Sequence, residues 1–144
     1  MNLSILALAA AVSSGQAQAA SPKNGDVYRC VLSSEQMAVF EKNTFNVKSS
    51  TEDSEQQLRV SSDSLETIWK GPLTGVLDSA TYRILSRSAH GLYGVLVAGL
   101  GAVRTGALVV DRSGVTVFTE TVGYTLPDGT FVQETMLSVC KKLR

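Results

Sequence analysis

Apolar and polar residues alternate along short stretches of this chain, which is the pattern of half-buried β-strands. In 44–48 and in 58–61 each apolar side chain is followed by a polar one. The same pattern, with turn residues between the stretches, predicts strands over 26–32, 44–48, 58–61, 65–70, 81–86, 92–98, 106–111, 114–120 and 131–140. Eight or nine short strands without long helices between them predict a mainly β fold, a single-domain antiparallel β-barrel or β-sandwich.

One stretch favours a helix instead. In 33–42, Ser33 and Gln36 fit an S-x-x-Q capping box, and Met37, Phe40 and Glu41 fall at helical spacing. We therefore expect one short N-terminal helix here, which would be held by packing against the strands.

The glycines and prolines mark turns. In 126–129, Pro127 presets φ for a turn and Gly129 accepts the left-handed conformation that follows. The segment 91–106 holds five glycines, but Arg104 breaks the G-x-G-x-x-G pattern, and Ala107 and Leu108 stand where a phosphate loop needs Lys and Ser or Thr. We therefore read 91–106 as two strands around a glycine-rich connection and expect no nucleotide cofactor.

The first nineteen residues have the pattern of a secretory signal peptide. An apolar run over 3–12 is too short to cross a bilayer and is followed by Ala17-Gln18-Ala19, a small-x-small cleavage sequence. We expect cleavage after Ala19, which leaves 20–144 as one β-rich domain in the periplasm or outside the cell. No cysteine lies near the cleavage site, so the sequence predicts no lipid anchor, and the short apolar run predicts no membrane span.

Cys30 and Cys140 are the only two cysteines. In an oxidising compartment an even pair favours a disulfide, which would place the first and last strands side by side. The alternative is two buried thiols that do not meet. Two distant cysteines and one histidine lack the number and spacing of zinc ligands, so we expect no metal site.

Charge and aromatic residues narrow the function. Thirteen basic and thirteen acidic residues give a net charge of +0, which offers no general attraction to nucleic acid. Aromatic side chains with polar tips and a nearby arginine are typical of recognition surfaces. The candidate binding residues are Trp69, Tyr82, His90, Tyr93 and Arg104. His90 is also the one histidine, near Ser86, Ser88 and Asp78 in sequence, so a small hydrolase that uses it is an alternative.

Tyr28-Arg29-Cys30 resembles the Tyr-x-Cys strand with which the bacterial periplasmic inhibitors of animal-type lysozymes begin. The late cysteine, Cys140, is a second point of resemblance to that family. That resemblance implies a small β-barrel and inhibition of an extracellular hydrolase, and it assigns no site residue here. From the residues themselves we expect a noncatalytic, exported binding module for a small apolar ligand or a protein partner, and the hydrolase inhibitor is the alternative.

Overall fold

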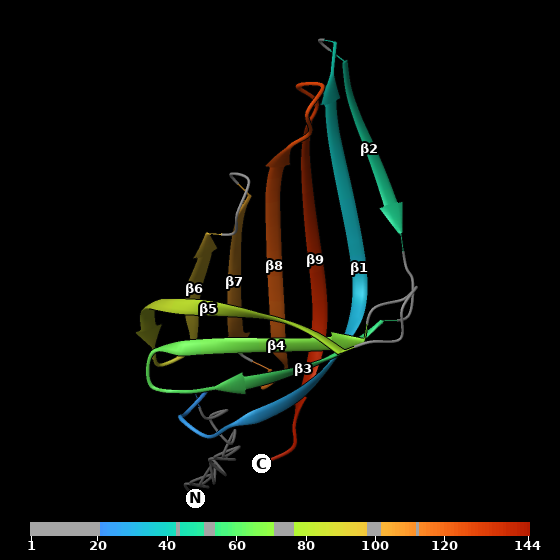
Figure 1. Ribbon diagram of the computed structural model, residues 1–144. Helices are drawn as coiled ribbons and strands as arrows, with labels where there is room; N and C mark the ends of the chain where they lie inside the picture. Colours follow the sequence, from blue (N-terminus) through green and yellow to red (C-terminus); the bar gives the residue numbers. More distant parts are fainter. Residues whose placement is uncertain (1–20, 43, 51–53, 71–76, 98–101, 112) are drawn as a thin grey trace, which may run out of the picture.

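A computed structural model describes residues 21–42, 44–50, 54–70, 77–97, 102–111 and 113–144 (Figure 1). The described chain is built of nine strands. They are β1 (Val27–Glu41), β2 (Thr44–Ser50), β3 (Glu55–Val60), β4 (Ser64–Lys70), β5 (Leu77–Ser88), β6 (Gly91–Val97), β7 (Val103–Val110), β8 (Thr116–Thr125) and β9 (Phe131–Lys142). Every neighbouring pair is antiparallel.

The sheet closes on itself. Strands β3 to β9 follow one another in chain order, and β1 pairs with both β3 and β9. The result is an eight-stranded barrel, and of the two predicted architectures it is the barrel that forms. β2 is an extra strand that pairs with the second half of β1, from Glu35 to Glu41.

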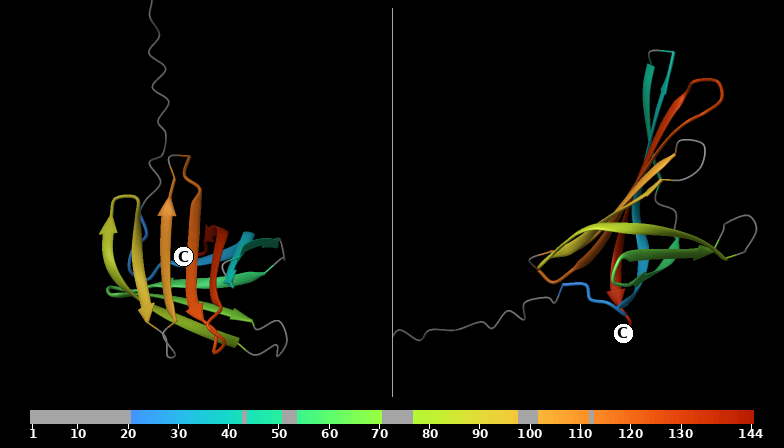
Figure 2. Two further views of the ribbon diagram at one scale, coloured as in Figure 1. Left: turned by 90° about the horizontal axis from the view of Figure 1, so that it is seen from above. Right: turned by 60° about the vertical axis from the view of Figure 1, so that its left-hand side comes forward.

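The barrel is flattened into two layers that cross. Strands β3, β4 and β5 run across the upright strands β6 to β9 and β1 (Figure 1). β1 and β5 belong to both layers, and each has a register shift, at Leu32/Ser34 and at Ile84/Ser86. Bulges bend a strand and increase its twist, which is how strands turn the corners of such a barrel. The β1–β2 and β8–β9 hairpins continue beyond the crossing strands as a projection (Figure 2).

Alternate residues of both layers point inward and fill the barrel. The largest fully buried apolar side chains are Tyr28, Leu58, Leu65, Tyr82, Leu108 and Phe118. The rings of Tyr82 and Phe118 meet edge to face, with centroids 6.4 Å apart. An eight-stranded barrel is just wide enough for side chains to fill it, and these residues do so.

The predicted helix over 33–42 is wrong, because 33–41 continue β1 and Lys42 lies in the turn that follows. The residues after the bulge fit a strand pattern as well as a helical one. Met37 and Val39 face inward, while Ala38 and Phe40 face outward, opposite Gln133 and Phe131 of β9. Partners on both sides, β9 and β2, give this stretch two ladders of hydrogen bonds. Local helix propensity is a weak preference that such long-range pairing overrides.

The remaining sequence predictions of secondary structure agree with the strands within a few residues. The predicted turn at 126–129 is present, since Gly129 has φ +87° and its N–H donates to the carbonyl oxygen of Leu126 at 2.9 Å. The predicted signal peptide, 1–19, and the glycine-rich connection at 98–101 lie outside the described residues. Within the described ranges, no helix has the length and apolarity needed to span a membrane.

Candidate functional site

The inward side of the barrel changes from apolar to polar toward the projecting end. Along β7 the inward side chain after Leu108 and Gly106 is Arg104, and along β8 Phe118 is followed by Glu120. Together with Trp69 of β4 and Tyr82 of β5, these residues form what we call the Arg104 cluster: Trp69, Tyr82, Arg104 and Glu120. It lies next to the apolar core, on the side toward the projection.

Glu120 joins the cluster. Its carboxylate oxygen Oε1 accepts a short hydrogen bond from the Tyr82 hydroxyl and lies 3.4 Å from Nη1 of Arg104. The Arg104 guanidinium in turn lies 5.9 Å from the centre of the Trp69 ring, which is within cation–π range. Every buried polar side-chain atom in the described residues has a hydrogen-bond partner, so the cluster is a satisfied network.

The cluster shifts the titration of its members. Burial raises the pKa of the Glu120 carboxyl. The Tyr82 hydrogen bond and the Arg104 charge oppose this effect, but the pKa of Glu120 stays above its ordinary value of 4.5. Burial, and then the charge and hydrogen bond of Glu120, raise the pKa of the Tyr82 hydroxyl. Tyr82 is therefore a hydrogen-bond donor throughout the physiological range.

Two glycines allow Tyr82 to reach Glu120. A Cβ on Gly94 would lie 2.9 Å from Cβ of Tyr82, and a Cβ on Gly106 would lie 3.1 Å from the Phe118 ring and 3.3 Å from the Tyr82 ring. Because both positions lack a side chain, the Tyr82 ring can lie over β6 and β7 and reach Glu120 of β8. The glycine-rich character of 91–106 thus has a packing role in its described part.

Two apolar side chains, Ile84 and Leu96, border the cluster. Like Trp69 of the cluster itself, they are partly buried and pack against the core. On the next inward positions, Tyr124 donates its hydroxyl hydrogen to Oε1 of Glu134 at 3.0 Å. Arg104 keeps 31% of its side chain exposed, whereas Glu120 keeps 6%. The arrangement offers a fixed, partly accessible guanidinium beside an apolar surface, which suits binding of an acidic group attached to an apolar body.

Three of the five candidate residues from the sequence come together here: Trp69, Tyr82 and Arg104. The other two lie elsewhere. His90 is exposed in the turn between β5 and β6, and Tyr93 is 39% exposed on the outer side of β6. The structure therefore gathers part of the predicted binding surface inside the barrel and leaves the rest outside it.

The residues considered for hydrolysis do not converge on His90. Asp78 is near the start of β5, whereas His90 follows its end. Ser88 Oγ accepts a hydrogen bond from the backbone N–H of His90 at 3.2 Å and donates one to the Gly91 carbonyl at 3.3 Å. These bonds shape the turn.

Sequence reasoning missed Glu120, although its stretch contains a signal. Phe118, Glu120 and Val122 are spaced by two, so a strand that buries the two apolar residues must also bury the carboxylate. A single charge in an inward row needs a partner, and Arg104 and Tyr82 supply it.

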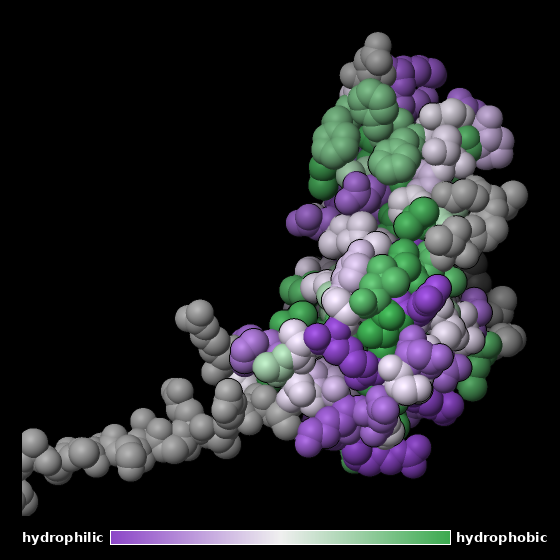
Figure 3. Space-filling view, turned by 90° about the vertical axis from the view of Figure 1, so that its left-hand side faces the viewer, coloured by the Kyte–Doolittle hydropathy of each residue, from purple (hydrophilic) through white to green (hydrophobic). Residues whose placement is uncertain are grey.

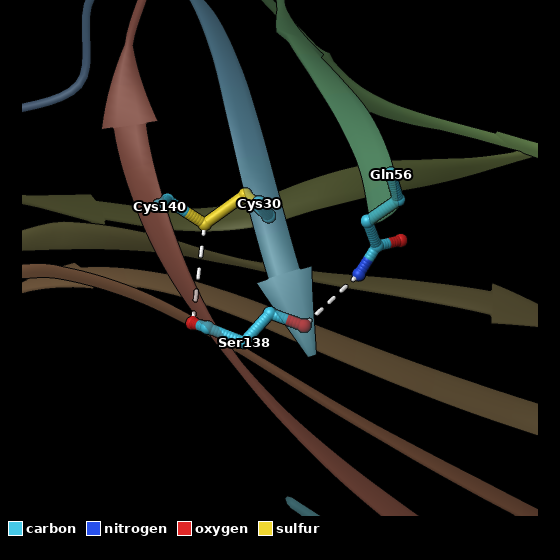
Figure 4. The surroundings of a disulfide bond; sticks show 4 residues. All are labelled: Cys30, Gln56, Ser138 and Cys140. Carbon is cyan, nitrogen blue, oxygen red and sulfur yellow. Dashed lines mark hydrogen bonds between the residues drawn. A yellow bond between two sulfur atoms is a disulfide. The ribbon is translucent and has the colours of Figure 1, made fainter. Parts of the chain in front are cut away.

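The predicted disulfide between Cys30 and Cys140 is present (Figure 4). It lies inside the barrel, where both cysteines are buried. Nearby, Nε2 of Gln56 donates to Oγ of Ser138 at 3.4 Å, which connects β3 to β9 behind the disulfide. The disulfide is thus a cross-link within the core and includes no residue of the Arg104 cluster.

Two shallow grooves lie on the projection. One, of about 250 Å³, lies between the hairpin tips and is lined by Glu41, Lys42, Asp128, Gly129 and Thr130. The other, of about 240 Å³, is lined by Glu35, Met37, Lys48, Ser49 and Ser50. Neither includes a residue of the Arg104 cluster.

In the part of the chain that the structure describes, no three His, Cys, Asp or Glu side chains gather as a metal site would require. Comparison of the chain with protein-family models, curated proteins and solved structures finds no match.

Proposed function

We propose that this protein is an exported, noncatalytic binding protein that holds a small amphipathic ligand at the open end of its barrel. In this proposal the acidic group of the ligand contacts Arg104, and its apolar body lies against Trp69, Ile84 and Leu96. The observation that carries the proposal is the state of Arg104, which is held by Glu120 and Trp69 while about a third of its side chain remains accessible.

Physical chemistry supports this pairing of groups. A guanidinium has five N–H donors, and the contact with Oε1 of Glu120 occupies one of its nitrogens. Charge-assisted hydrogen bonds in a partly dry site are among the stronger polar contacts in proteins. Because the contact with Glu120 already fixes the guanidinium, the Arg104 side chain loses little additional conformational entropy when a carboxylate binds.

The chain carries its own probe for the test, because Trp69 is its one tryptophan. Trp69 emission should change in a saturable way on titration with decanoate, an acidic ligand with an apolar chain. Arg104→Gln should weaken decanoate binding at least about 10-fold, the effect of losing one charged hydrogen bond. Decanol, which lacks the acid, should bind the wild type and this variant alike. Arg83→Gln, at an exposed arginine of β5, is the matched control and should bind decanoate as the wild type does.

The proposal fails if a panel of such amphiphiles leaves both Trp69 emission and the melting temperature unchanged. It also fails if Arg104→Gln binds decanoate as tightly as the wild type. Native mass spectrometry of the exported protein adds an independent reading, since a carrier often retains a molecule through purification.

Export into the periplasm or beyond the cell is part of the same proposal. Disulfides form and persist in oxidising compartments, and Cys30 and Cys140 are paired. The mass of the exported protein tests the predicted cleavage: the expected product begins at Ala20. An unprocessed chain in the cytosol would contradict it.

A second candidate is inhibition of an extracellular hydrolase. It is favoured by one observation, namely that an eight-stranded barrel opens on a Tyr28-x-Cys30 strand bonded to its last strand, as the resemblance to the lysozyme inhibitors implies. A stoichiometric loss of animal-type lysozyme activity on adding the protein would support it. Full lysozyme activity at a large molar excess of the protein would exclude it for that enzyme class.

A further inference from the structure

The outward side of the upright strands forms a broad uncharged surface. Because directly paired residues share a face, the strand registers arrange its side chains in five rows. We call these rows the outer face. From the barrel base toward the tip they are Val31, Val139, Val117 and Val109; Ser34, Leu137, Thr119, Ala107 and Tyr93; Ser49, Gln36, Thr135, Thr121, Thr105 and Val95; Val47, Ala38, Gln133, Gly123 and Val103; and Phe45, Phe40, Phe131 and Thr125.

None of these described residues is charged, although the chain as a whole has 26 charged side chains among 144. Charges border the face on two sides: Arg29 pairs in register with Lys141 below the valine row, and Arg83 of β5 pairs with Val95 at the end of the third row. Of the fifteen large hydrophobic side chains exposed in the described residues, ten lie on this face. Apolar side chains gather visibly over the projecting end of the molecule (Figure 3). Such a concentration marks an interaction surface, because exposed apolar residues on monomers are usually scattered.

The tip row carries the largest apolar side chains of the face. Phe40 lies directly opposite Phe45 on one side and Phe131 on the other, so three rings form a ladder across β2, β1 and β9. Their exposed fractions are 46%, 64% and 42%. At the opposite end of the face, four valines form an equivalent apolar row.

We propose that the outer face packs against the same face of a second copy of this chain. A surface without charge has nothing to pair with a charged partner, whereas it matches another uncharged sheet, and two sheets pack face to face about 10 Å apart. With strands about 4.8 Å apart and about 3.4 Å per residue, the rows across β1, β9, β8 and β7 cover about 650 Å² per copy, close to the roughly 800 Å² of a stable interface.

The order of the rows fits twofold symmetry. The third of the five rows, with Gln36, Thr135 and Thr121, is the middle one, and Oγ1 of Thr121 lies 3.5 Å from Oγ1 of Thr135. A twofold axis through this row reverses the strand direction of the second copy. The phenylalanine row of each copy then covers the valine row of the other, so both apolar ends are buried and the hydroxyls face each other at the centre.

The dimer leaves the Arg104 cluster accessible, because the side chains of that cluster point to the inward side of the barrel, away from the outer face. Dimerisation and ligand binding therefore rest on different residues, and either can fail without the other.

The test is the oligomeric state of the exported, disulfide-bonded protein, measured by sedimentation from about 1 to 100 µM. The wild type should dimerise within this range. Thr121→Arg places two like charges at the twofold axis and should weaken the dimer at least about 100-fold. Thr81→Arg makes the same change at an exposed threonine on the outer side of β5 and should leave the dimer intact.

A wild type that stays monomeric throughout overturns the proposal, including when it binds an unrelated protein through this face. A dimer that survives Thr121→Arg, or that Thr81→Arg dissociates equally, also overturns it. If circular dichroism shows that Thr121→Arg does not fold, Val139→Glu replaces it, because Val139 is 47% exposed on the same face.

Discussion

Cys30 and Cys140 lie directly opposite each other on β1 and β9, with their Cα atoms 4.0 Å apart. β1 and β9 are the pair whose ladder closes the barrel. The disulfide therefore joins the two ends of the described chain at the place where the sheet meets itself, and it does so among the buried residues of the core.

Replacing both cysteines, as Cys30→Ser with Cys140→Ser, should lower the free energy of unfolding by about 4–5 kcal/mol, because the bond closes a loop of 110 residues in the unfolded chain. The barrel should still form, since the β1–β9 ladder runs from Tyr28 to Phe40. Urea unfolding measures the loss. Reduced wild-type protein is the control and should unfold near the same midpoint as the double variant. A decrease in unfolding free energy below about 1 kcal/mol would mean that the β1–β9 ladder alone holds the barrel closed.

Most strands could be predicted from the sequence because they alternate between an exposed and a buried side, as β3, β8 and β9 do. The stretch 33–42 could not, because its apolar residues fit both a period of two and a helical period. Its true conformation depends on β9, about a hundred residues later in the chain, and on β2. No local pattern contains that information.

The candidate site was partly readable. Trp69, Tyr82 and Arg104 could be chosen by residue type, but their meeting point is Glu120, which the sequence analysis did not select. Tyr93 has the same side chain as Tyr82, but strand parity places it on the outer side of β6, and His90 lies in the turn before that strand. Residue type selects candidates, whereas register decides which of them share the interior.

Gly94→Ala tests whether the missing side chain is what admits Tyr82. The new Cβ would lie 2.9 Å from Tyr82 Cβ and 3.0 Å from the carbonyl oxygen of Arg83, so backbone must move. We expect a loss of about 1–3 kcal/mol, typical of overpacking. Gly123→Ala is the matched control in a strand, because its nearest neighbour is the Phe131 ring at 3.5 Å. It should cost nothing or stabilise slightly. Equal melting temperatures for the two variants would refute the steric explanation.

Glu120 should make the fold less stable as the pH rises. Burial raises its pKa in the folded protein above the ordinary 4.5, so between these two values the folded state binds more proton than the unfolded chain. Stability from this group is therefore full below pH 4.5 and is lost as the pH rises through the folded pKa. Glu120→Gln removes the titration and keeps an oxygen for the Tyr82 hydroxyl. Relative to this variant, the wild type should lose unfolding free energy across that window in urea titrations at successive pH values.

Tyr82→Phe gives the check on that prediction. The Tyr82 hydrogen bond lowers the pKa of Glu120, so its removal should move the window to higher pH. A window that stays in place, or one that moves to lower pH, would show that Glu120 does not depend on this hydroxyl.

Asp26 should give the opposite pH dependence of stability. It lies where β1 and β9 meet, next to Lys142 of β9. Its buried carboxylate accepts hydrogen bonds from the Lys23 N–H at 2.9 Å and the Tyr28 hydroxyl at 3.0 Å, and it lies 2.6 Å from Nζ of Lys142. Burial alone would raise its pKa, but the bonds from Lys142, Lys23 and Tyr28 outweigh burial and hold the pKa below 3.8. Its contribution is therefore complete above pH 3.8 and is lost as the pH falls through the folded pKa.

Asp26→Asn keeps the shape and removes the charge. We expect it to cost about 1–3 kcal/mol at about pH 7, because a charged acceptor of buried donors is lost, and to cost progressively less as acid protonates the wild type. Urea unfolding of both proteins over the acidic range gives the difference curve. A constant difference at every pH would show that the carboxylate contributes by shape alone. Since Asp26 loses its contribution on acidification and Glu120 on alkalinisation, the wild type should be most stable between the two windows, and each single variant should flatten one side of that maximum.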